Sequence, residues 1–386
     1  MRDKWTYKKI GDVCEVVSGS TPKTNVPEFW GKGHYWVTPA ELDDTTIYIN
    51  KTERQITDAA LEKTNLQLLP VGTVLLSSRA PIGKVAITDE EMYCNQGFKN
   101  LICSDELYNK FLYYFLKYKK DYLNNLGRGA TFKEISKSIV EKVCVPLPPI
   151  NTQLSIVAEF DKTSELIALK KSQLMNLDKL AQSIFYDLFG NPLINDRKWI
   201  IKKYGDCFTI GSGGTPSKSN PLYWKNGDIP WIGSNMCQNC VITKTDGKFI
   251  TTEGLNNSSA KMLESGTVLV ALVGATIGKV ALLKIRTSTN QNIAFIKVND
   301  SNSFCSEYVY YHLMNQHEEF LLIGNGDFKM ASQAFIKSLP IMMPPLSLQK
   351  SFAAQISSIE QQKQQISSSI NDLETLLASR MQYWFD

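Results

Sequence analysis

The chain has 386 residues, 43% of them hydrophobic, which is enough to bury two ordinary domain cores. Its formal net charge of +4 permits a nucleic-acid partner without demanding one. No apolar run reaches the roughly 18 residues of a membrane span, and Met1 to Ile10 is polar, so we expect neither a membrane helix nor a secretory signal.

The first predicted element is a mixed α and β domain at residues 1–149. β-branched and aromatic runs such as residues 72–87, punctuated by Gly, Pro, Asn and Asp, predict short strands joined by loops. One helical stretch lies among them, around residues 108–125. Residues 150–190 then lose Gly and Pro almost entirely, which predicts one long helix that begins just after a pair of prolines.

A second domain and a second long helix follow in the same order. Residues 191–345 mix strands, such as residues 266–285, with a helix around 306–322, and residues 346–386 predict another long helix. Apolar residues in both long helices recur at spacings of three and four, which indicates a coiled-coil seam. The seam residues are Ile156, Phe160, Ile167, Leu174, Leu177, Ala181, Ile184 and Leu188 in the first helix, and Phe352, Ile356, Ile359, Ile366, Ile370, Leu373, Leu377 and Trp384 in the second.

Each seam is interrupted by a cation, Lys170 in the first helix and Lys363 in the second. A long lysine stem can reach solvent at the edge of a helix, so the interruption can be neutral. A charge at a seam position can also forbid pairing in a wrong register. Both interpretations stay open at this point.

The two halves are copies of one another, separated by about 194 residues. The matches keep their order along the chain: Ser18-Gly19-Ser20-Thr21-Pro22 with Ser212-Gly213-Gly214-Thr215-Pro216, Trp30 and Trp36 with Trp224 and Trp231, Ile82-Gly83-Lys84 with Ile277-Gly278-Lys279, Asn95-Gln96 with Asn290-Gln291, Phe132-Lys133 with Phe328-Lys329, and Pro148-Pro149 with Pro344-Pro345. The repeat predicts an α+β protein of two domains related by a pseudo-two-fold axis and separated by antiparallel helices. Trp384 and Phe385 would then return toward the first domain.

Metal-binding and redox patterns are weak. His34, His312 and His317 lack the spacings of a metal site, and surface or packing roles are expected for them. Cys237 and Cys240 form a CxxC without a second pair. The eight cysteines are spread thinly, as expected of reduced thiols, so we expect a cytoplasmic protein.

Two further constellations imitate active sites. Asn220-Pro221-Leu222-Tyr223 is similar to an amino-methyltransferase motif, but its counterpart in the first half lacks the Asn. Asp228 with Asp246 and Lys248 imitates a metal-dependent nuclease, but the first half has Thr52 and Arg54 in place of the latter two. Neither pattern therefore predicts an activity shared by both domains.

The doubled order of these motifs, each copy ending in Pro-Pro before a long helix, resembles the specificity subunit of type I restriction and modification systems over essentially the whole chain. The resemblance implies two target-recognition domains that each read half of a bipartite site in double-stranded DNA. It implies helices that set the spacer and dock two methylation subunits, with restriction subunits joining through the complex. The alternatives are an autonomous DNA methyltransferase or nuclease, and a coiled-coil scaffold that does not bind DNA.

The resemblance also implies a noncatalytic chain that binds no cofactor or metal. S-adenosylmethionine, ATP and magnesium are then expected in the partner subunits. The domain limits that follow are residues 1–149 and 191–345 for the recognition domains, and residues 150–190 and 346–386 for the spacer helices.

Candidate DNA contacts lie in the glycine-rich loops, whose amides, hydroxyls and lysines suit phosphate oxygens. Tight turns would need the same residues. Positions that both halves share suit backbone contact or scaffolding, and positions that differ suit base readout; at least one Trp of each pair is expected in the core. The shared Asn-Gln pairs could read adenine, but they more often satisfy buried backbone groups. The candidates are Thr21, Pro22, Lys23, Arg79, Lys84, Asn95, Gln96, Arg128, Thr131, Lys133, Gly214, Thr215, Lys218, Lys279, Asn290, Gln291 and Lys329.

Overall fold

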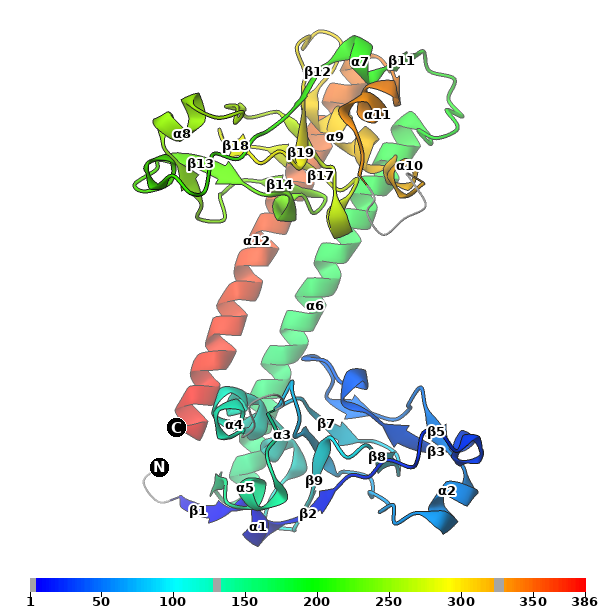
Figure 1. The fold of residues 1–386 in the computed structure, drawn as a ribbon, viewed down its shortest axis with the longest axis vertical. Helices are drawn as coiled ribbons and strands as arrows, with labels where there is room; N and C mark the ends of the chain where they lie inside the picture. Colours follow the sequence, from blue (N-terminus) through cyan, green and yellow to red (C-terminus); the bar gives the residue numbers. More distant parts are fainter. Residues whose placement is uncertain (1–4, 128–132, 323–329) are drawn as a thin grey trace. The chain divides into compact units, whose positions relative to one another are not determined.

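The computed structural model describes residues 5–127, 133–322 and 330–386. The chain forms two compact units, one of Met1–Lys171 with Ser369–Asp386 and one of Ser172–Ser368, which we call the first and the second unit. Each combines one mixed domain with a part of each long helix (Figure 1). Across the described ranges, no helix is both long enough and apolar enough to span a bilayer.

The domain of the first unit is built on a five-stranded sheet in its described residues. Its strand order is β2 (Cys14–Ser18), β9 (Phe98–Cys103), β6 (Val74–Ser77), β7 (Val85–Thr88) and β4 (Tyr48–Ile49). Strands β6 and β7 are buried on both faces, which explains their continuous apolar sequences. A second sheet contains β5 (Gln55–Ile56), β3 (Trp30–Val37) and β8 (Tyr93–Cys94), and β1 (Thr6–Lys9) pairs with β10 (Cys144–Leu147).

The domain of the second unit repeats this topology strand for strand. The order of its main sheet is β12 (Thr209–Ser212), β19 (Ile293–Lys297), β16 (Val268–Ala271), β17 (Val280–Leu283) and β14 (Cys240–Ile242). The smaller sheet contains β15 (Phe249–Ile250), β13 (Ile229–Ile232) and β18 (Ser288–Thr289), and β11 (Ile201–Lys203) pairs with β20 (Pro340–Met342). The edge strands β4 and β14 both pair in parallel with their neighbours. The predicted pair of α+β copies is confirmed.

The helical stretch predicted inside each domain is present, but it divides into two short helices. Residues 108–125 form α3 (Asn109–Tyr118) and α4 (Lys120–Leu126), and residues 306–322 form α9 (Ser306–Met314) and α10 (His317–Leu321). Neither break contains Gly or Pro, so its cause is tertiary. The second helix packs against the turn after β6 or β16, where Gly83 lies close to Lys120 and Gly278 close to Phe320. In the first unit the Asn124 side chain also donates to the Ile82 carbonyl in this turn at 3.0 Å. The remaining short α-helices are α1 (Ile10–Val13), α2 (Asp58–Lys63), α5 (Lys137–Glu141), α7 (Tyr204–Cys207), α8 (Thr252–Asn256) and α11 (Gln333–Ser338).

The long helices α6 (Ile150–Phe189) and α12 (Leu346–Phe385) match their predicted ranges to within one residue. Their ends pack into the domain cores. In the first unit the Phe385 ring lies 5.3 Å from Phe111 and 5.8 Å from Phe160, centroid to centroid, so the predicted return of the chain's end to the first domain is confirmed. In the second unit Phe185 and Phe189 of α6 meet Phe352 of α12. These two rings were absent from the predicted seam because a domain core, rather than a helix partner alone, surrounds them.

A fully buried glutamine joins each long helix to its domain. Gln153 accepts a hydrogen bond from the Tyr108 amide at 2.8 Å, and its side-chain nitrogen donates to the carbonyls of Glu106 and Pro148. In the second unit Gln349 makes the same three bonds, to the Cys305 amide and to the carbonyls of Ser303 and Pro344. The recurring Pro-Pro and Gln pattern therefore anchors each helix at its start.

Candidate functional site

Two tryptophans hold the glycine-rich loop of the first domain. Trp36 Nε1 donates to the Ser20 carbonyl at 3.1 Å, and Trp30 Nε1 donates to the Lys23 carbonyl at 3.2 Å. The rings meet edge to face, with centroids 4.9 Å apart. Trp36 is buried and Trp30 is half-buried, as expected of a pair with one core member.

The second domain holds its loop in the same way. Trp231 Nε1 donates to the Gly214 carbonyl at 3.0 Å, and Trp224 Nε1 donates to the Ser217 carbonyl at 3.1 Å. Their ring centroids lie 5.2 Å apart, and Trp231 is the buried member. The shape of the loop is thus fixed by a shared pair of indole donors.

The shared Asn-Gln turn lies directly against this loop. Asn95 Nδ2 donates to Thr21 Oγ1 at 3.2 Å, and Asn95 Oδ1 accepts from the Gly97 amide at 2.6 Å. A Cβ on Gly19 would overlap the backbone of Asn95, so the close approach requires glycine. The Asn95 amide is therefore committed within the protein, while the Gln96 side chain is exposed.

The corresponding turn of the second domain is tied in a similar way. Thr215 Oγ1 donates to Gln291 Oε1, and Asn290 Oδ1 accepts from the Asn292 amide at 3.1 Å. Gly213 approaches the backbone of Thr289 too closely for any other residue. The sequence prediction that these asparagines satisfy backbone groups agrees with both turns.

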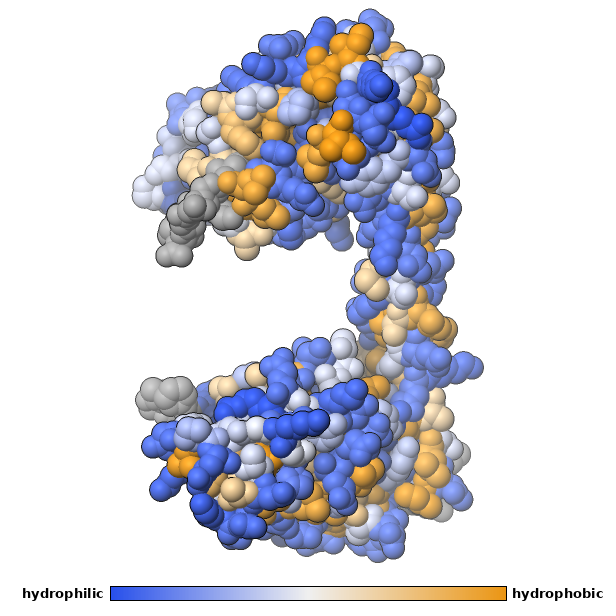
Figure 2. All heavy atoms as spheres, turned by 90° about the vertical axis from the view of Figure 1, so that its right-hand side faces the viewer, coloured by the Kyte–Doolittle hydropathy of each residue, from blue (hydrophilic) through white to orange (hydrophobic). Residues whose placement is uncertain are grey.

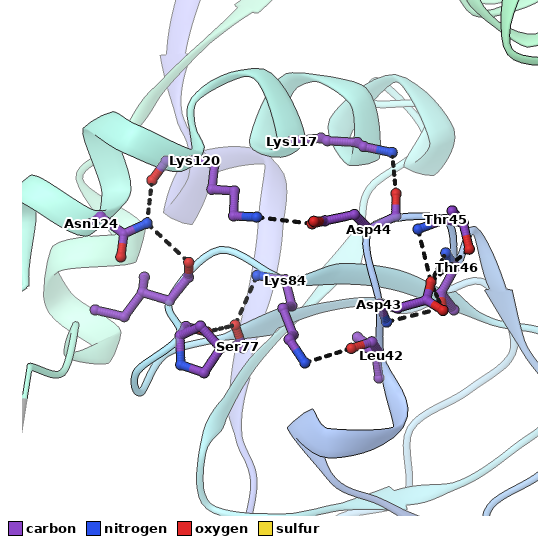
Figure 3. Close-up of polar contacts among 12 residues, drawn as sticks. Leu42, Asp43, Asp44, Thr45, Thr46, Ser77, Lys84, Lys117, Lys120 and Asn124 are labelled. Atoms are coloured by element: carbon purple, nitrogen blue, oxygen red, sulfur yellow. Dashed lines mark hydrogen bonds and ion pairs between the residues drawn. The ribbon is translucent and has the colours of Figure 1, made fainter. Parts of the chain in front are cut away.

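The shared lysines reach across to the segment that follows β3 or β13. Lys84 Nζ donates to the carbonyls of Pro39 and Leu42 at 2.9 and 2.6 Å, as Figure 3 shows for Leu42. Lys279 Nζ donates to Gln238 Oε1 at 2.7 Å. Both ammonium groups therefore hold neighbouring loops in place.

The segment beside Lys84 carries two carboxylates, Asp43 and Asp44 (Figure 3), and the pKa of each is lowered. Hydrogen bonds from Thr45 and Thr46 lower the pKa of Asp43 to about 2. A hydrogen bond from Lys120 lowers the pKa of Asp44. Both groups are ionised at neutral pH, which offsets the positive charge of the nearby lysines.

Among the remaining candidates, Arg79 differs between the domains. Arg79 Nε donates to Glu134 Oε2 at 3.0 Å, and the backbones of these two residues form an isolated bridge. Val273 occupies the same position opposite Met330. Lys23, Lys133 and Lys218 are exposed, and none has a carboxylate within ion-pair distance among the residues that the structure describes. Pro22 is buried, and Arg128, Thr131 and Lys329 lie outside the described residues.

Arg54 was aligned with Lys248 in the sequence but was missed as a candidate DNA contact. Its guanidinium carbon lies 3.8 Å from the centroid of the Trp30 ring and 5.3 Å from that of Trp36. The side chain is exposed, and no carboxylate of the described ranges forms an ion pair with it. The Arg54 carbonyl accepts from the Trp36 amide, as the Lys248 carbonyl accepts from Trp231. This register, which aligns Arg54 with Lys248, was the available signal.

The second domain carries a different charge arrangement at this position. Lys248 Nζ pairs with Asp246 Oδ2 at 2.8 Å, so that its ammonium is partly neutralised. The supposed nuclease pair is thus an internal ion pair, and within the described ranges no group of His, Cys, Asp or Glu side chains could hold a metal ion. Asn220 Oδ1 accepts from the Leu222 amide at 3.1 Å and so caps a short 3₁₀ turn. Both active-site imitations therefore have structural explanations.

Comparisons with known proteins agree with the duplicated architecture. The family model for the type I restriction modification DNA specificity domain matches residues 2–178 and 196–375. The MjaIX specificity subunit of Methanocaldococcus jannaschii, a type I restriction enzyme subunit, is 33% identical over 292 residues, which cover 71% of this chain and 67% of that subunit. The MjaVIII specificity subunit of the same organism is 24% identical over 398 residues, covering 93% and 86%.

A solved structure has the same fold. The crystal structure of the S subunit of a type I restriction-modification system from M. genitalium matches with a TM-score of 0.57 at 17% identity. The match covers 99% of this chain and 96% of that one. The likeness therefore extends through both units and both long helices.

Proposed function

Because the chain belongs to the type I restriction modification DNA specificity family, we propose that each of its two domains reads one half of a bipartite site in double-stranded DNA. The chain thereby gives a restriction and modification complex its sequence specificity. The observation that carries this proposal is the duplicated loop. Two tryptophans hold it identically in both domains, yet it adjoins Arg54 in one and a Lys248–Asp246 pair in the other.

The exposed lysines of the glycine-rich loops are proposed to grip phosphates. Lys23 and Lys218 are exposed on loops of fixed shape, where cations and amides can contact phosphate oxygens. Lys133 is exposed as well. Lys84 and Lys279 are better suited to scaffolding, because their ammonium groups already bind protein acceptors.

Base readout is proposed to rest on groups that differ between the domains. A guanidinium held flat on an indole keeps a fixed direction, and its N–H fork matches the O6 and N7 atoms of guanine. The Arg54 guanidinium carbon lies over the Trp30 ring beside the loop of the first domain, 3.8 Å from the ring centroid. We therefore assign Arg54 to a guanine in the half-site of that domain.

The long helices are proposed to set the spacer and to dock methylation subunits. Forty helical residues span ~60 Å. Apolar side chains remain exposed along them, visible as orange patches in Figure 2. On the first unit they include Leu154, Leu166, Leu169 and Leu376, with exposed fractions of 41 to 59%. Such surfaces support contact with protein partners.

We further propose that the chain itself is noncatalytic. S-adenosylmethionine would then bind the methylation subunits, and ATP and magnesium would act with restriction subunits. The structural roles of Asn220 and Asp246 support this assignment, because Asn220 caps a turn and Asp246 pairs with Lys248. Turnover of DNA by the purified chain with S-adenosylmethionine and magnesium would overturn it.

The recognition proposal is tested by sequencing the methylated bases in a host that expresses the chain with its partner subunits. We expect a bipartite motif with a guanine in one half. Arg54→Ala should relax that position by about 10- to 100-fold in relative methylation while the other half-site stays unchanged. Lys248→Ala is the matched control and should leave the first half-site intact. A motif with one undivided site would contradict the proposal.

The spacer role has a separate test. Inserting the same few helical residues into α6 and α12 should change the gap between the half-sites and leave both half-site sequences alone. A gap that stays fixed would contradict it.

A further inference from the structure

A cavity of about 310 Å³ lies in the second unit between β14, β17, α9 and α12. Its volume is at the lower end of the ~300–1,000 Å³ typical of ligand pockets. The lining includes Val241 of β14, Lys284 just after β17, Glu307, Tyr310 and Tyr311 of α9, and Ser357 and Glu360 of α12. Two carboxylates, two phenols and one ammonium group therefore line a space large enough for a side chain.

The first unit offers an internal comparison, because the residues equivalent to the pocket lining can be identified there from strand pairing and from position along the helices. Tyr48 pairs with Ile87 as Val241 pairs with Leu282 on the equivalent strands. Lys110 and Glu307 are each the second residue of their helices, α3 and α9. Asp161 follows the buried Gln153 at the same interval as Ser357 follows Gln349.

In the first unit the chain fills this space itself. Lys110 Nζ pairs with Asp161 Oδ2 at 2.8 Å and lies 5.3 Å from the centroid of the Tyr48 ring. The Tyr114 hydroxyl donates to Asp161 Oδ1 at 2.7 Å, and the Tyr113 hydroxyl donates to the Thr46 carbonyl at 3.1 Å. An ammonium group and two satisfied phenols thus occupy the site.

The second unit lacks each of these partners. Val241 and Ser357 are smaller than Tyr48 and Asp161, and a carboxylate, Glu307, replaces the ammonium of Lys110. Tyr310 and Tyr311 are only 3% and 4% exposed. Among the described residues their hydroxyls have no hydrogen-bond partner, and burial raises the pKa of both, so they remain protonated.

The charges around the cavity leave an excess of carboxylate. Glu307 Oε1 pairs with Lys284, and Glu360 Oε1 pairs with Lys363, in each case at 2.8 Å. Lys363 also pairs with Asp178, so three carboxylates share two ammonium groups. Each glutamate forms its ion pair through Oε1, and its Oε2 can accept from a guest.

We propose that this pocket receives a basic side chain of the methylation subunit that docks on the second unit. An arginine fits best, because its five N–H donors can meet two carboxylates and two phenolic oxygens. One wall of the pocket is α12, so the site is continuous with the helix surface assigned to that partner. The inference rests on the proposed function, and it makes the two docking faces chemically different.

The sharpest test copies the first unit into the second. A chain carrying Val241→Tyr, Glu307→Lys and Ser357→Asp should close the pocket with residues that already fit this fold. Sedimentation velocity and calorimetry with the methylation subunit should show two subunits on the wild-type chain. On the closed variant one site should weaken by about tenfold or more while the other is unchanged.

A milder variant tests the effect on binding separately from the effect on folding. Tyr310→Phe with Tyr311→Phe removes only hydroxyls that lack a partner within the described residues, so the thermal unfolding temperature should not fall. Affinity at the same site should fall by about 3- to 10-fold. Gln355→Asp, on an exposed position of α12, is the control and should bind as the wild type does.

Unchanged affinity and stoichiometry in the closed variant would overturn the pocket assignment and leave the proposed function standing. Failure of the wild-type chain to bind any methylation subunit would instead refute the proposed function. Spermidine tests for a small amine as occupant. Spermidine bound in the pocket would raise the unfolding temperature of the wild type but not of the closed variant. If this is seen, and the closed variant still binds both methylation subunits normally, the assignment to a protein side chain is wrong.

Discussion

The two domains share a fold but differ at one pair of core positions. In the first domain these positions are Ile10, the first residue of α1, and Phe115 in α3, and both are almost completely buried. The second places Tyr204 and His312 at the equivalent positions, also fully buried. The Tyr204 hydroxyl and His312 Nδ1 lie 3.1 Å apart, and the Met342 amide donates to His312 Nε2 at 3.3 Å.

The difference shows which features the fold requires. A buried polar pair replaces an apolar pair because the ring nitrogens and the hydroxyl find partners, which avoids the cost of unsatisfied groups. The glutamine anchors and tryptophan pairs, in contrast, are identical in both domains. We infer that the shared groups maintain the fold, while unshared groups, even buried ones, are free to diverge.

The largest expected effect comes from breaking a shared anchor. Gln349→Leu removes partners from one buried amide and two carbonyls, and each unsatisfied group costs about 1–3 kcal/mol. We expect the free energy of unfolding of the second unit to fall by at least about 3 kcal/mol in urea titrations. Gln153→Leu should affect the first unit equally. Gln355→Leu, exposed on the same helix as Gln349, should change little; equal losses from Gln349→Leu and Gln355→Leu would refute the anchor role.

A smaller effect should follow from the unshared pair. Burial lowers the pKa of His312 from 6.5 to about 3, so between these values the unfolded chain binds a proton that the folded chain does not. The free energy of unfolding should therefore fall as pH falls from about 6.5 toward about 3, with a loss of about 2 kcal/mol at about pH 5.

The matched variant copies the first domain. Tyr204→Ile with His312→Phe should remove this part of the pH dependence, while the carboxylates that titrate in both proteins cancel in the difference. Urea unfolding of the wild type and the double variant at a series of pH values measures the difference in their free energies of unfolding. If the two plots of unfolding free energy against pH are parallel, His312 does not cause the pH dependence.

The sequence predicted the features that local patterns encode. The repeat, the α+β class and both long helices follow from spacing and from the Pro pairs, because helix limits are set by neighbouring residues. The break between α3 and α4 was not predicted, since no Gly or Pro marks it, and the contact of Asn124 with the turn after β6 joins residues 42 apart in the sequence.

The candidate site divides in the same way. The loop glycines and Asn95 were found because turns leave a sequence signature. The hydrogen bonds from Lys84 to two backbone carbonyls were not found, because more than 40 residues separate Lys84 from Pro39 and Leu42. The stacking of Arg54 on Trp30 likewise depends on a strand pairing between distant segments.

The smallest expected effect concerns the cations that interrupt the helix seams. Lys363 is half-buried and pairs with Asp178 on α6 as well as with Glu360, both at 2.8 Å. Burial alone would lower its pKa, and the hydrogen bonds to Asp178 and Glu360 outweigh that and raise it. Lys363→Leu should therefore leave two carboxylates without their counter-charge and reduce the free energy of unfolding by about 1 kcal/mol at low salt, and by less at high salt.

Lys170→Leu is the matched change in the other seam. If a lysine at the seam matters only through its long stem, both substitutions should be nearly neutral, within about 0.5 kcal/mol. If the ion pair with α6 is what fixes the register, only Lys363→Leu should destabilise, and the loss should shrink as salt is added. Urea titrations of both variants at low and high salt distinguish these outcomes, because screening weakens an ion pair and leaves apolar packing of the stem unchanged.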